Sequence, residues 1–174
     1  MIVTVDKLKQ HITTDVPVPV LEEKLLALET MVRKYTNNNF QHRNIRERCP
    51  VVSQKLYLAN HMFKVGDTVQ ISESQFNDGV YTVAVVEGNL VTVSEDLIDE
   101  PNALVTMVKY PADVQMGVIN LMKWELTNRD KVGISSETIS RHSVTYFNMD
   151  GDNSTMGFPK SLMGFLRPYK KARF

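Results

Sequence analysis

The chain has 174 residues, which suits one medium domain or a small core with an inserted module, and it is long enough to bury a core without disulfides. Its 20 basic and 20 acidic side chains leave no overall charge, so binding of DNA or RNA would need a local basic patch. A single cysteine excludes an internal disulfide framework, and no apolar run approaches the ~20 residues that cross a bilayer.

The first residues predict two helices. Thr4 can cap a short helix that reaches about Ile12. After a break at 15–19, Pro19 opens a longer helix that extends to about Tyr35. Its apolar residues follow a four-three spacing that makes a narrow stripe, which must be buried on another element. These residues are Leu21, Leu25, Leu28, Val32 and Tyr35.

From about Cys49 to Tyr110 the apolar period changes from helical to alternating. Turn sequences such as Asn77-Asp78-Gly79 and Glu87-Gly88-Asn89 separate the alternating runs. Several short strands joined by tight turns predict a small antiparallel β-barrel. The predicted strands are 54–58, 68–71, 79–86, 90–93 and 104–108.

A third helix is predicted from Ala112 to about Asp130, with Pro111 at its start. We expect it to pack against the helix at 19–35, because neither can bury its apolar stripe alone. The predicted fold class is therefore α+β. A small helical bundle core, 1–48 and 111–174, carries an inserted antiparallel β-barrel module, 49–110. An extended C-terminal arm and a short helix complete the core.

The arm and the short helix form the last third of the chain. Residues 135–146 are rich in Ser, Thr and Val and predict an extended segment whose backbone needs a partner. That partner is either a neighbouring subunit or the arm itself, folded as an intramolecular hairpin. Pro159 opens a short helix, and Pro168 is expected to end it and leave a mobile, cationic, aromatic tail.

Candidate catalytic and metal-binding groups are incomplete. Cys49 and His42 lack the third group that would orient a nucleophile and its base. The segment 150–154 resembles a calcium loop, but Thr155 and Ser161 stand where glycine and glutamate are required. The four histidines show no metal-ligand spacing. We expect no catalytic residue, no cofactor and no metal, and therefore no enzyme.

Three stretches resemble the head–tail connector (adaptor, or head-completion) proteins of long-tailed bacteriophages. They are the opening 2–9, the helix start Tyr110-Pro111-Ala112-Asp113-Val114, and the arm 134–146 followed by 158–166. The module at 49–110 departs from the family, whose compact members have a short loop there.

This resemblance implies a structural protein of the virion neck. Such proteins form a ring beneath the portal, expected to be twelve-fold, which extends the DNA channel and joins the DNA-filled head to the next neck protein, the stopper, or the tail. Packaged DNA would pass through without sequence-specific binding, no membrane would be involved, and assembly would take place in the host cytoplasm.

Two sets of residues are candidates for contacts in such a ring. Aromatic and basic side chains commonly anchor interfaces, and the C-terminal segment is rich in both. The candidates for docking on the portal are Leu162, Phe165, Leu166, Arg167, Tyr169, Lys170, Lys171, Arg173 and Phe174. The candidates for contact between subunits are Ser135, Ser136, Thr138, Ile139, Ser143, Val144, Thr145 and Tyr146.

The alternative hypothesis is a nucleic-acid-binding protein built on a small β-barrel. Barrels of this kind bind nucleic acid through basic grooves, and Arg43, Arg46 and Arg48 precede the predicted module. Within the module acidic residues outnumber basic ones, which disfavours this hypothesis. Salt-dependent DNA binding by the isolated protein would favour it, and portal-dependent ring assembly would favour the connector.

Overall fold

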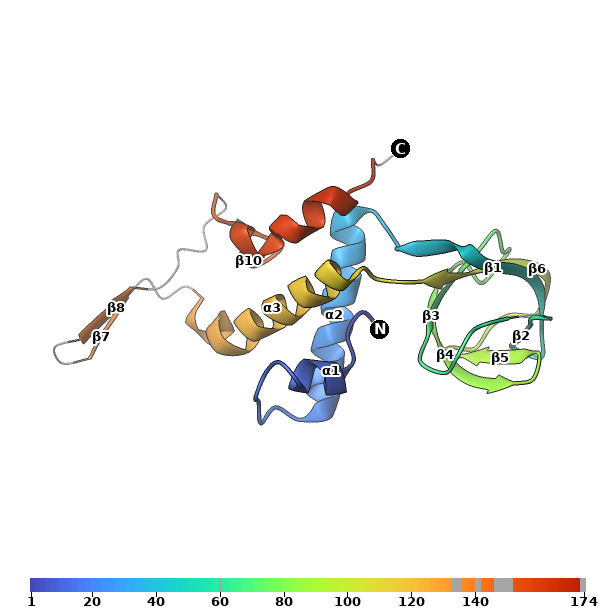
Figure 1. The fold of residues 1–174 in the computed structure, drawn as a ribbon, viewed down its shortest axis with the longest axis horizontal. Coiled ribbons are helices and arrows are strands. Elements are labelled where there is room, and N and C mark those ends of the chain that lie inside the picture. The colour runs from blue at the N-terminus through green and yellow to red at the C-terminus, as the bar shows by residue number, and fades with distance from the viewer. Residues whose placement is uncertain (60, 133–135, 140–141, 146–151, 173–174) are drawn as a thin grey trace. The chain divides into compact units, whose positions relative to one another are not determined.

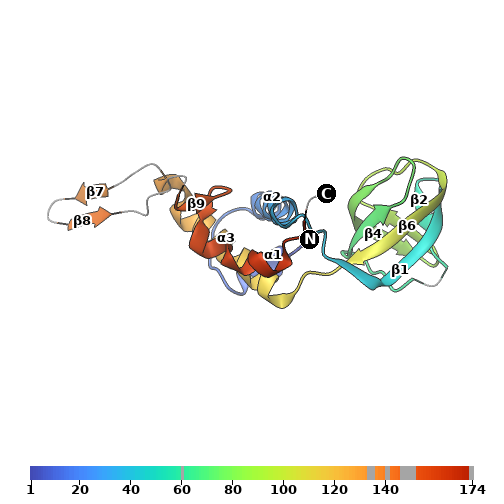
Figure 2. The same cartoon turned by 90° about the horizontal axis from the view of Figure 1, so that it is seen from above.

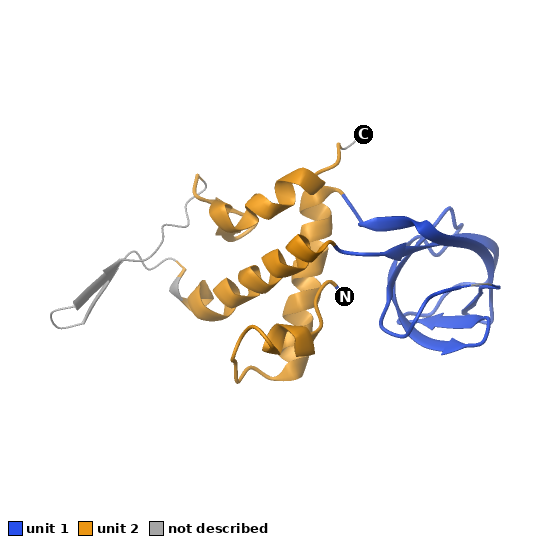
Figure 3. Cartoon of the chain, in the orientation of Figure 1, with its two compact units in different colours: residues 1, 38–110 blue, residues 2–37, 111–174 orange. Residues whose placement is uncertain are grey.

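The computed structural model describes residues 1–172 except 60, 133–135, 140–141 and 146–151. The chain forms two compact units, one made of residues 1 and 38–110 and the other of 2–37 and 111–174 (Figure 3). The first unit is a closed β-barrel and the second is mainly helical. The predicted α+β class with a barrel is confirmed.

The barrel has six strands, and each neighbouring pair is antiparallel (Figures 1 and 2). Around the barrel the order is β1-β2-β5-β4-β3-β6, and pairing of β1 with β6 closes it. Alternating side chains such as Val69, Ile71 and Val105 fill the interior. The strands are β1 (Gln41–Val52), β2 (Lys55–Tyr57), β3 (Thr68–Ser72), β4 (Gly79–Glu87), β5 (Leu90–Val93) and β6 (Glu100–Val108).

The barrel begins earlier than the sequence pattern indicates. The module was expected from Cys49, but β1 starts at Gln41. Most residues of 41–48 are polar, so they show no alternating apolar pattern. They form a strand because β6 offers them a ladder of backbone partners, with Arg46 opposite Thr106. A strand that is stabilised by pairing with a distant segment need not show an alternating apolar pattern in its own sequence.

The two ends of the barrel differ in what they carry. At the proximal end the chain enters and leaves, and the backbone N–H of Lys109 donates to the carbonyl of Phe40 (2.9 Å). There the rings of Phe40 and Tyr110 pack with their centroids 5.0 Å apart. The opposite, distal end carries the tight turn 53–54 and the loops 73–78 and 94–99, because β1, β3 and β5 all end there.

The helical unit is built on α1 (Val5–Lys9), α2 (Val18–Thr36) and α3 (Ala112–Asn128). Thr4 caps α1, as predicted, by accepting a hydrogen bond from the Lys7 N–H (3.3 Å). The apolar stripe of α2 is buried from Leu21 to Val32, and α2 packs against α3. Asn37 ends α2 in the left-handed conformation, with φ at 49°.

The described residues in the last third of the chain form four short strands and two 3₁₀ helices, η1 (Arg129–Lys131) and η2 (Lys160–Tyr169). Strands β7 (Ser136–Ile139) and β8 (His142–Thr145) form an antiparallel hairpin, and β9 (Ser154–Thr155) pairs with β10 (Phe158–Pro159). Pro159 precedes η2 as predicted, but Pro168 lies inside it. The expected stop at Pro168 is wrong by one residue, because the fixed φ of proline is compatible with a helical turn and its missing N–H matters little next to the helix end.

Candidate functional site

The apolar face of η2 packs on its own chain. Met163 and Leu166 are 2% and 0% exposed, and the ring of Phe165 lies directly against Gly117 of α3. A residue other than glycine at 117 would place its Cβ within the space of that ring. Leu166 is therefore unavailable to a partner, which corrects its assignment as a docking residue. The physical reason is that a short helix needs packing to be stable, and α3 provides it.

The segment after η2 is bound to the helical unit instead of being a mobile tail. The Lys171 N–H donates to the carbonyl of Thr36 (2.8 Å), and the Asn37 side-chain amide donates to the carbonyl of Ala172 (2.8 Å). The last carbonyls of a helix lack partners within it, so the end of α2 offers acceptors to a passing chain. The prediction of a mobile tail is wrong up to Ala172, and Arg173 and Phe174 lie outside the described residues.

Two side chains of the same segment are held as well. The Tyr169 hydroxyl donates to both carboxylate oxygens of Asp113 (2.8 Å each), and this hydrogen bond raises the pKa of Tyr169. The Lys170 ammonium lies 3.9 Å from the ring centroid of Tyr35, a cation–π contact. Each contact joins two residues that lie far apart in the sequence, so no local sequence pattern could predict it.

Several docking candidates remain on the surface. Arg167 and Lys170 are exposed, and with Lys160 they line a shallow hollow of about 530 Å³ on the helical unit. Leu162 and Phe165 are half-buried. The C-terminal segment thus presents a cationic surface held in place by its own core.

Arg129 joins the end of α3 to the β9–β10 turn. Its guanidinium lies 5.0 Å from the ring centroid of Trp124 and 4.9 Å from that of Phe158. The same side chain donates to Glu125 Oε2 (2.8 Å) and to the carbonyl of Gly157 (2.9 Å). It therefore ties the end of α3, which precedes the hairpin, to the β9–β10 turn, which follows it.

Glu125 extends this anchor to α2. Its carboxylate also accepts a hydrogen bond from Lys24 Nζ (3.0 Å). Burial alone would raise the pKa of Glu125, but hydrogen bonds from Arg129 and Lys24 outweigh it and hold the pKa below its ordinary value. This cluster was not predicted from the sequence. Its signal was the i,i+4 spacing of Glu125 and Arg129 beside Trp124.

The predicted arm lies between these anchored segments. Its residues at 136, 138 and 139 belong to β7 and those at 143–145 to β8, while Ser135 and Tyr146 lie outside the described residues. The backbone pairing is intramolecular, with Ser136 opposite Thr145 and Ile139 opposite His142. Of the two partners left open for the arm backbone, the hairpin is the one formed. The sheet has two strands, so within the described chain each strand keeps one edge without a strand partner.

The one cysteine of the chain is buried in the barrel core, where its side chain packs against apolar neighbours. Cys49 is 2% exposed in the barrel interior, and burial, aided by the charges of Glu47 and Glu100, raises its pKa to about 12. A thiol with that pKa is a poor nucleophile at neutral pH. Within the part of the chain that the structure describes, no three His, Cys, Asp or Glu side chains are grouped to hold a metal ion.

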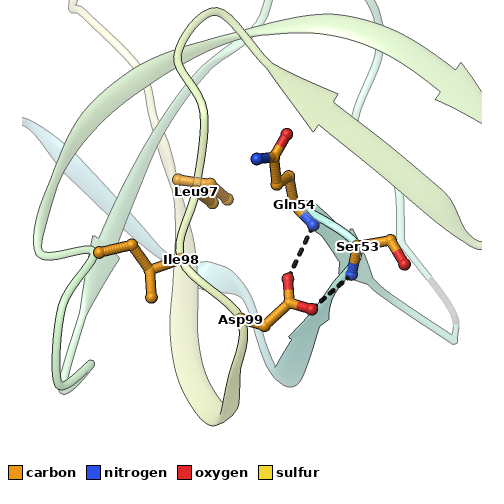
Figure 4. A pocket seen from close by; sticks show the side chains of 5 residues that line it. All are labelled: Ser53, Gln54, Leu97, Ile98 and Asp99. Carbon is orange, nitrogen blue, oxygen red and sulfur yellow. Dashed lines mark hydrogen bonds between the residues drawn. The ribbon is translucent and has the colours of Figure 1, made fainter.

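The distal end of the barrel has a network of hydrogen bonds that joins its loops. The Asp99 carboxylate accepts from the backbone N–H groups of Ser53 (3.0 Å) and Gln54 (2.8 Å), which lie in a turn with positive φ (Figure 4). The Gln54 and Ser53 N–H groups lower the pKa of Asp99. Asn77 exchanges two hydrogen bonds of 2.8 Å with the backbone of Ile98.

A second carboxylate completes this network. Glu100 is buried, and it accepts from the backbone N–H of Gln75 (2.7 Å) and from the side-chain amide of Asn77. Asp99 and Glu100, at the start of β6, thereby bind the turn 53–54 and the loop 73–78 to the end of the loop 94–99. The sequence placed Asn77 in a turn, but no pattern indicated the hydrogen-bond partners of Asn77 or Glu100, because these partners lie in other loops.

No known protein family matches this chain, and no curated protein matches it. In the described residues no helix is long and apolar enough to cross a membrane.

Proposed function

We propose that this protein is a structural component of a bacteriophage neck. Its helical unit serves as a small bundle core that assembles into a ring beneath the portal, expected to be twelve-fold. The ring extends the DNA channel and joins the DNA-filled head to the next neck protein or the tail. The barrel is a module inserted into this core.

The β7–β8 hairpin is the observation that carries the proposal. A two-stranded hairpin is marginally stable alone in water, and both of its outer edges are open to another strand. Arg129 joins the end of α3, which precedes the hairpin in the sequence, to Gly157, which follows it. Within the described residues neither outer edge of the hairpin has a strand partner, and such an edge can pair with a strand of a neighbouring copy. Head-to-tail contacts of that kind close into rings.

The cationic hollow of the C-terminal segment is the candidate surface for the portal. Arg167 and Lys170 are held by a folded segment, so an interface formed there would lose little conformational entropy on binding. This differs from binding by a mobile tail, which would have to be ordered first.

The barrel gives little support to the alternative of nucleic-acid binding. Residues 38–110 contain nine acidic and six basic side chains, a formal charge of −3. DNA binding depends on neutralising phosphates with Lys and Arg, which an acidic module disfavours.

The proposal is tested by replacing residues 136–145 with two glycines in the full-length protein. Because the hairpin is a separate two-stranded sheet, we expect the melting temperature of the purified variant to match that of the natural chain. We expect DNA-filled heads to lose the variant, as measured by immunoblotting of purified particles. A matched control, Thr138→Ala alone, should be incorporated normally.

Two results would contradict the proposal. Normal incorporation of the hairpin-deleted variant, with normal tail joining, would remove the arm from ring assembly. Absence of the natural protein from DNA-filled heads, together with strongly salt-dependent DNA binding by the isolated chain, would favour the nucleic-acid-binding alternative.

A further inference from the structure

The loops at the distal end of the barrel are joined by hydrogen bonds and carry exposed side chains. Its loops are tied together through Asp99, Glu100 and Asn77, so their backbones are held before any partner arrives. Loops that are ordered in advance lose little entropy on binding. The hydrogen bonds therefore prepare a surface at the end of the barrel away from the chain connections.

Large apolar side chains cover this surface. Phe76 and Ile98 are each 56% exposed, and Val52 is 52% exposed next to the turn that Asp99 holds. Phe76 and Ile98 lie on adjacent loops, since Asn77 forms both hydrogen bonds to the backbone of Ile98. A hollow of about 540 Å³ opens beside Ile98, lined by the turn 53–54 (Figure 4). Exposed apolar side chains grouped beside a hollow are typical of a protein-binding surface.

The surrounding charge limits the kind of partner. Loops 73–78 and 94–99 hold five carboxylates and no Lys or Arg. One of the five, Glu73, is paired with Arg48, and Asp99 is engaged with the turn, while Asp78, Glu95 and Asp96 are exposed. Nucleic acid and anionic surfaces would be repelled. The complementary face is apolar at its centre and carries Lys or Arg at its edge.

We propose that the distal end of the barrel is the docking surface for the next protein of the neck, on the tail side, and that this protein's contact face is apolar with a basic rim. This inference rests on the proposed neck function. The chain presents two surfaces of opposite charge, the cationic hollow on the helical unit and the acidic, apolar distal end of the barrel. A partner that complements one of these surfaces would be repelled by the other, so each surface suits a different partner. The portal is assigned to the cationic hollow, which leaves the distal end of the barrel for the next neck protein.

The test uses the full-length double variant Phe76→Ser/Ile98→Ser. A control, Met62→Ser/Val65→Ser, removes two somewhat smaller apolar side chains that are 63% and 65% exposed between β2 and β3, at the proximal end. Both variants should melt like the natural chain, because the replaced side chains are exposed. DNA-filled heads are then purified and mixed with tails, and the two readouts are the amount of protein in heads and the yield of tailed particles.

We expect both variants to enter heads at the natural level. Tail joining by the distal-end variant should fall at least about tenfold, while the control joins tails normally. Normal tail joining by the distal-end variant would overturn the proposal. So would its loss from heads, which would place the portal at this end of the barrel. If the natural chain self-associates in sedimentation experiments and this variant does not, the occupant is a second copy and the proposal is also wrong.

Failure of the underlying function gives a different result from failure of this inference. If the natural protein is absent from DNA-filled heads, the neck function itself is wrong. If the natural protein is present in heads and the distal-end variant joins tails as well as the control does, the neck function stands and the docking surface lies elsewhere.

Discussion

Cys49 lies in β1 with its side chain directed into the barrel core, where it is 2% exposed. Transfer of a thiolate out of water is unfavourable, so burial is the main reason that its pKa rises to about 12. The carboxylates of Glu47 and Glu100 add to this effect by repelling a second negative charge. At this position the thiol acts as a small apolar group, and its role is packing.

The reactivity of Cys49 follows from that pKa. At pH 8 the thiolate fraction in the folded chain should be about a thousand-fold below that of a thiol with the ordinary pKa of 9.0. We expect Ellman's reagent to modify the folded protein at least that much more slowly than the same chain in concentrated denaturant. Comparable rates in the two conditions would show that the barrel opens readily around β1.

At the scale of elements, the contact of η2 with α3 depends on one missing side chain. Gly117 lets the ring of Phe165 lie directly on the α3 backbone. An interior glycine usually costs a helix about 1 kcal/mol relative to alanine, so the close approach must return more than that. The contact holds the C-terminal segment near α2, where Lys171 reaches the carbonyl of Thr36.

Gly117→Ala should therefore destabilise the protein despite the better helix propensity of alanine. The new methyl group overlaps the Phe165 ring, and such overpacking typically lowers the free energy of unfolding by about 1–3 kcal/mol. Gly164→Ala in η2 is the matched control, because nothing lies within 4 Å of the Cβ it adds. Urea titration of both variants measures the difference, and equal stabilities would contradict the packing described here.

Local patterns in the sequence predicted those elements whose burial is periodic. The stripe from Leu21 to Val32 gave α2, and alternating residues gave the strands from β3 to β6. The polar start of β1 and the folded C-terminal segment escaped prediction for one reason: their partners lie far away in the chain. Tyr169 binds Asp113 and Lys171 binds Thr36, and neither pair has a spacing that marks it in advance. The anchor at Arg129 was visible in part, through Glu125 four residues earlier.

At the scale of the whole molecule, the chain divides into two units, and residues 38–110 of the barrel lie in the sequence between the two parts of the helical unit. The barrel begins and ends at residues that touch, since Lys109 donates to the carbonyl of Phe40. The buried side chains of α2 and α3 lie in the helical unit, and those of the barrel strands lie in the barrel. An insertion with adjacent ends can be removed without stretching the chain on either side.

Replacement of residues 41–108 by a short Gly/Ser linker should leave a helical protein that unfolds cooperatively. The reason is that the linker needs to span only the distance now bridged by the hydrogen bond between Phe40 and Lys109. Thermal melting followed by far-UV circular dichroism would measure it. A broad transition without a defined midpoint would mean that the helical unit depends on the barrel for its stability.

The closeness of Phe40 and Lys109 also bears on the order of folding. If the barrel residues were still unfolded, packing of α2 against α3 would close a loop of about 70 residues, at an entropic cost of roughly 4 kcal/mol. All residues of the barrel are synthesised before α3, so it can form first and bring the two attachment points together. In a chain with a single cysteine, the folded barrel does what a disulfide does elsewhere: it shortens the path between distant helices before they meet.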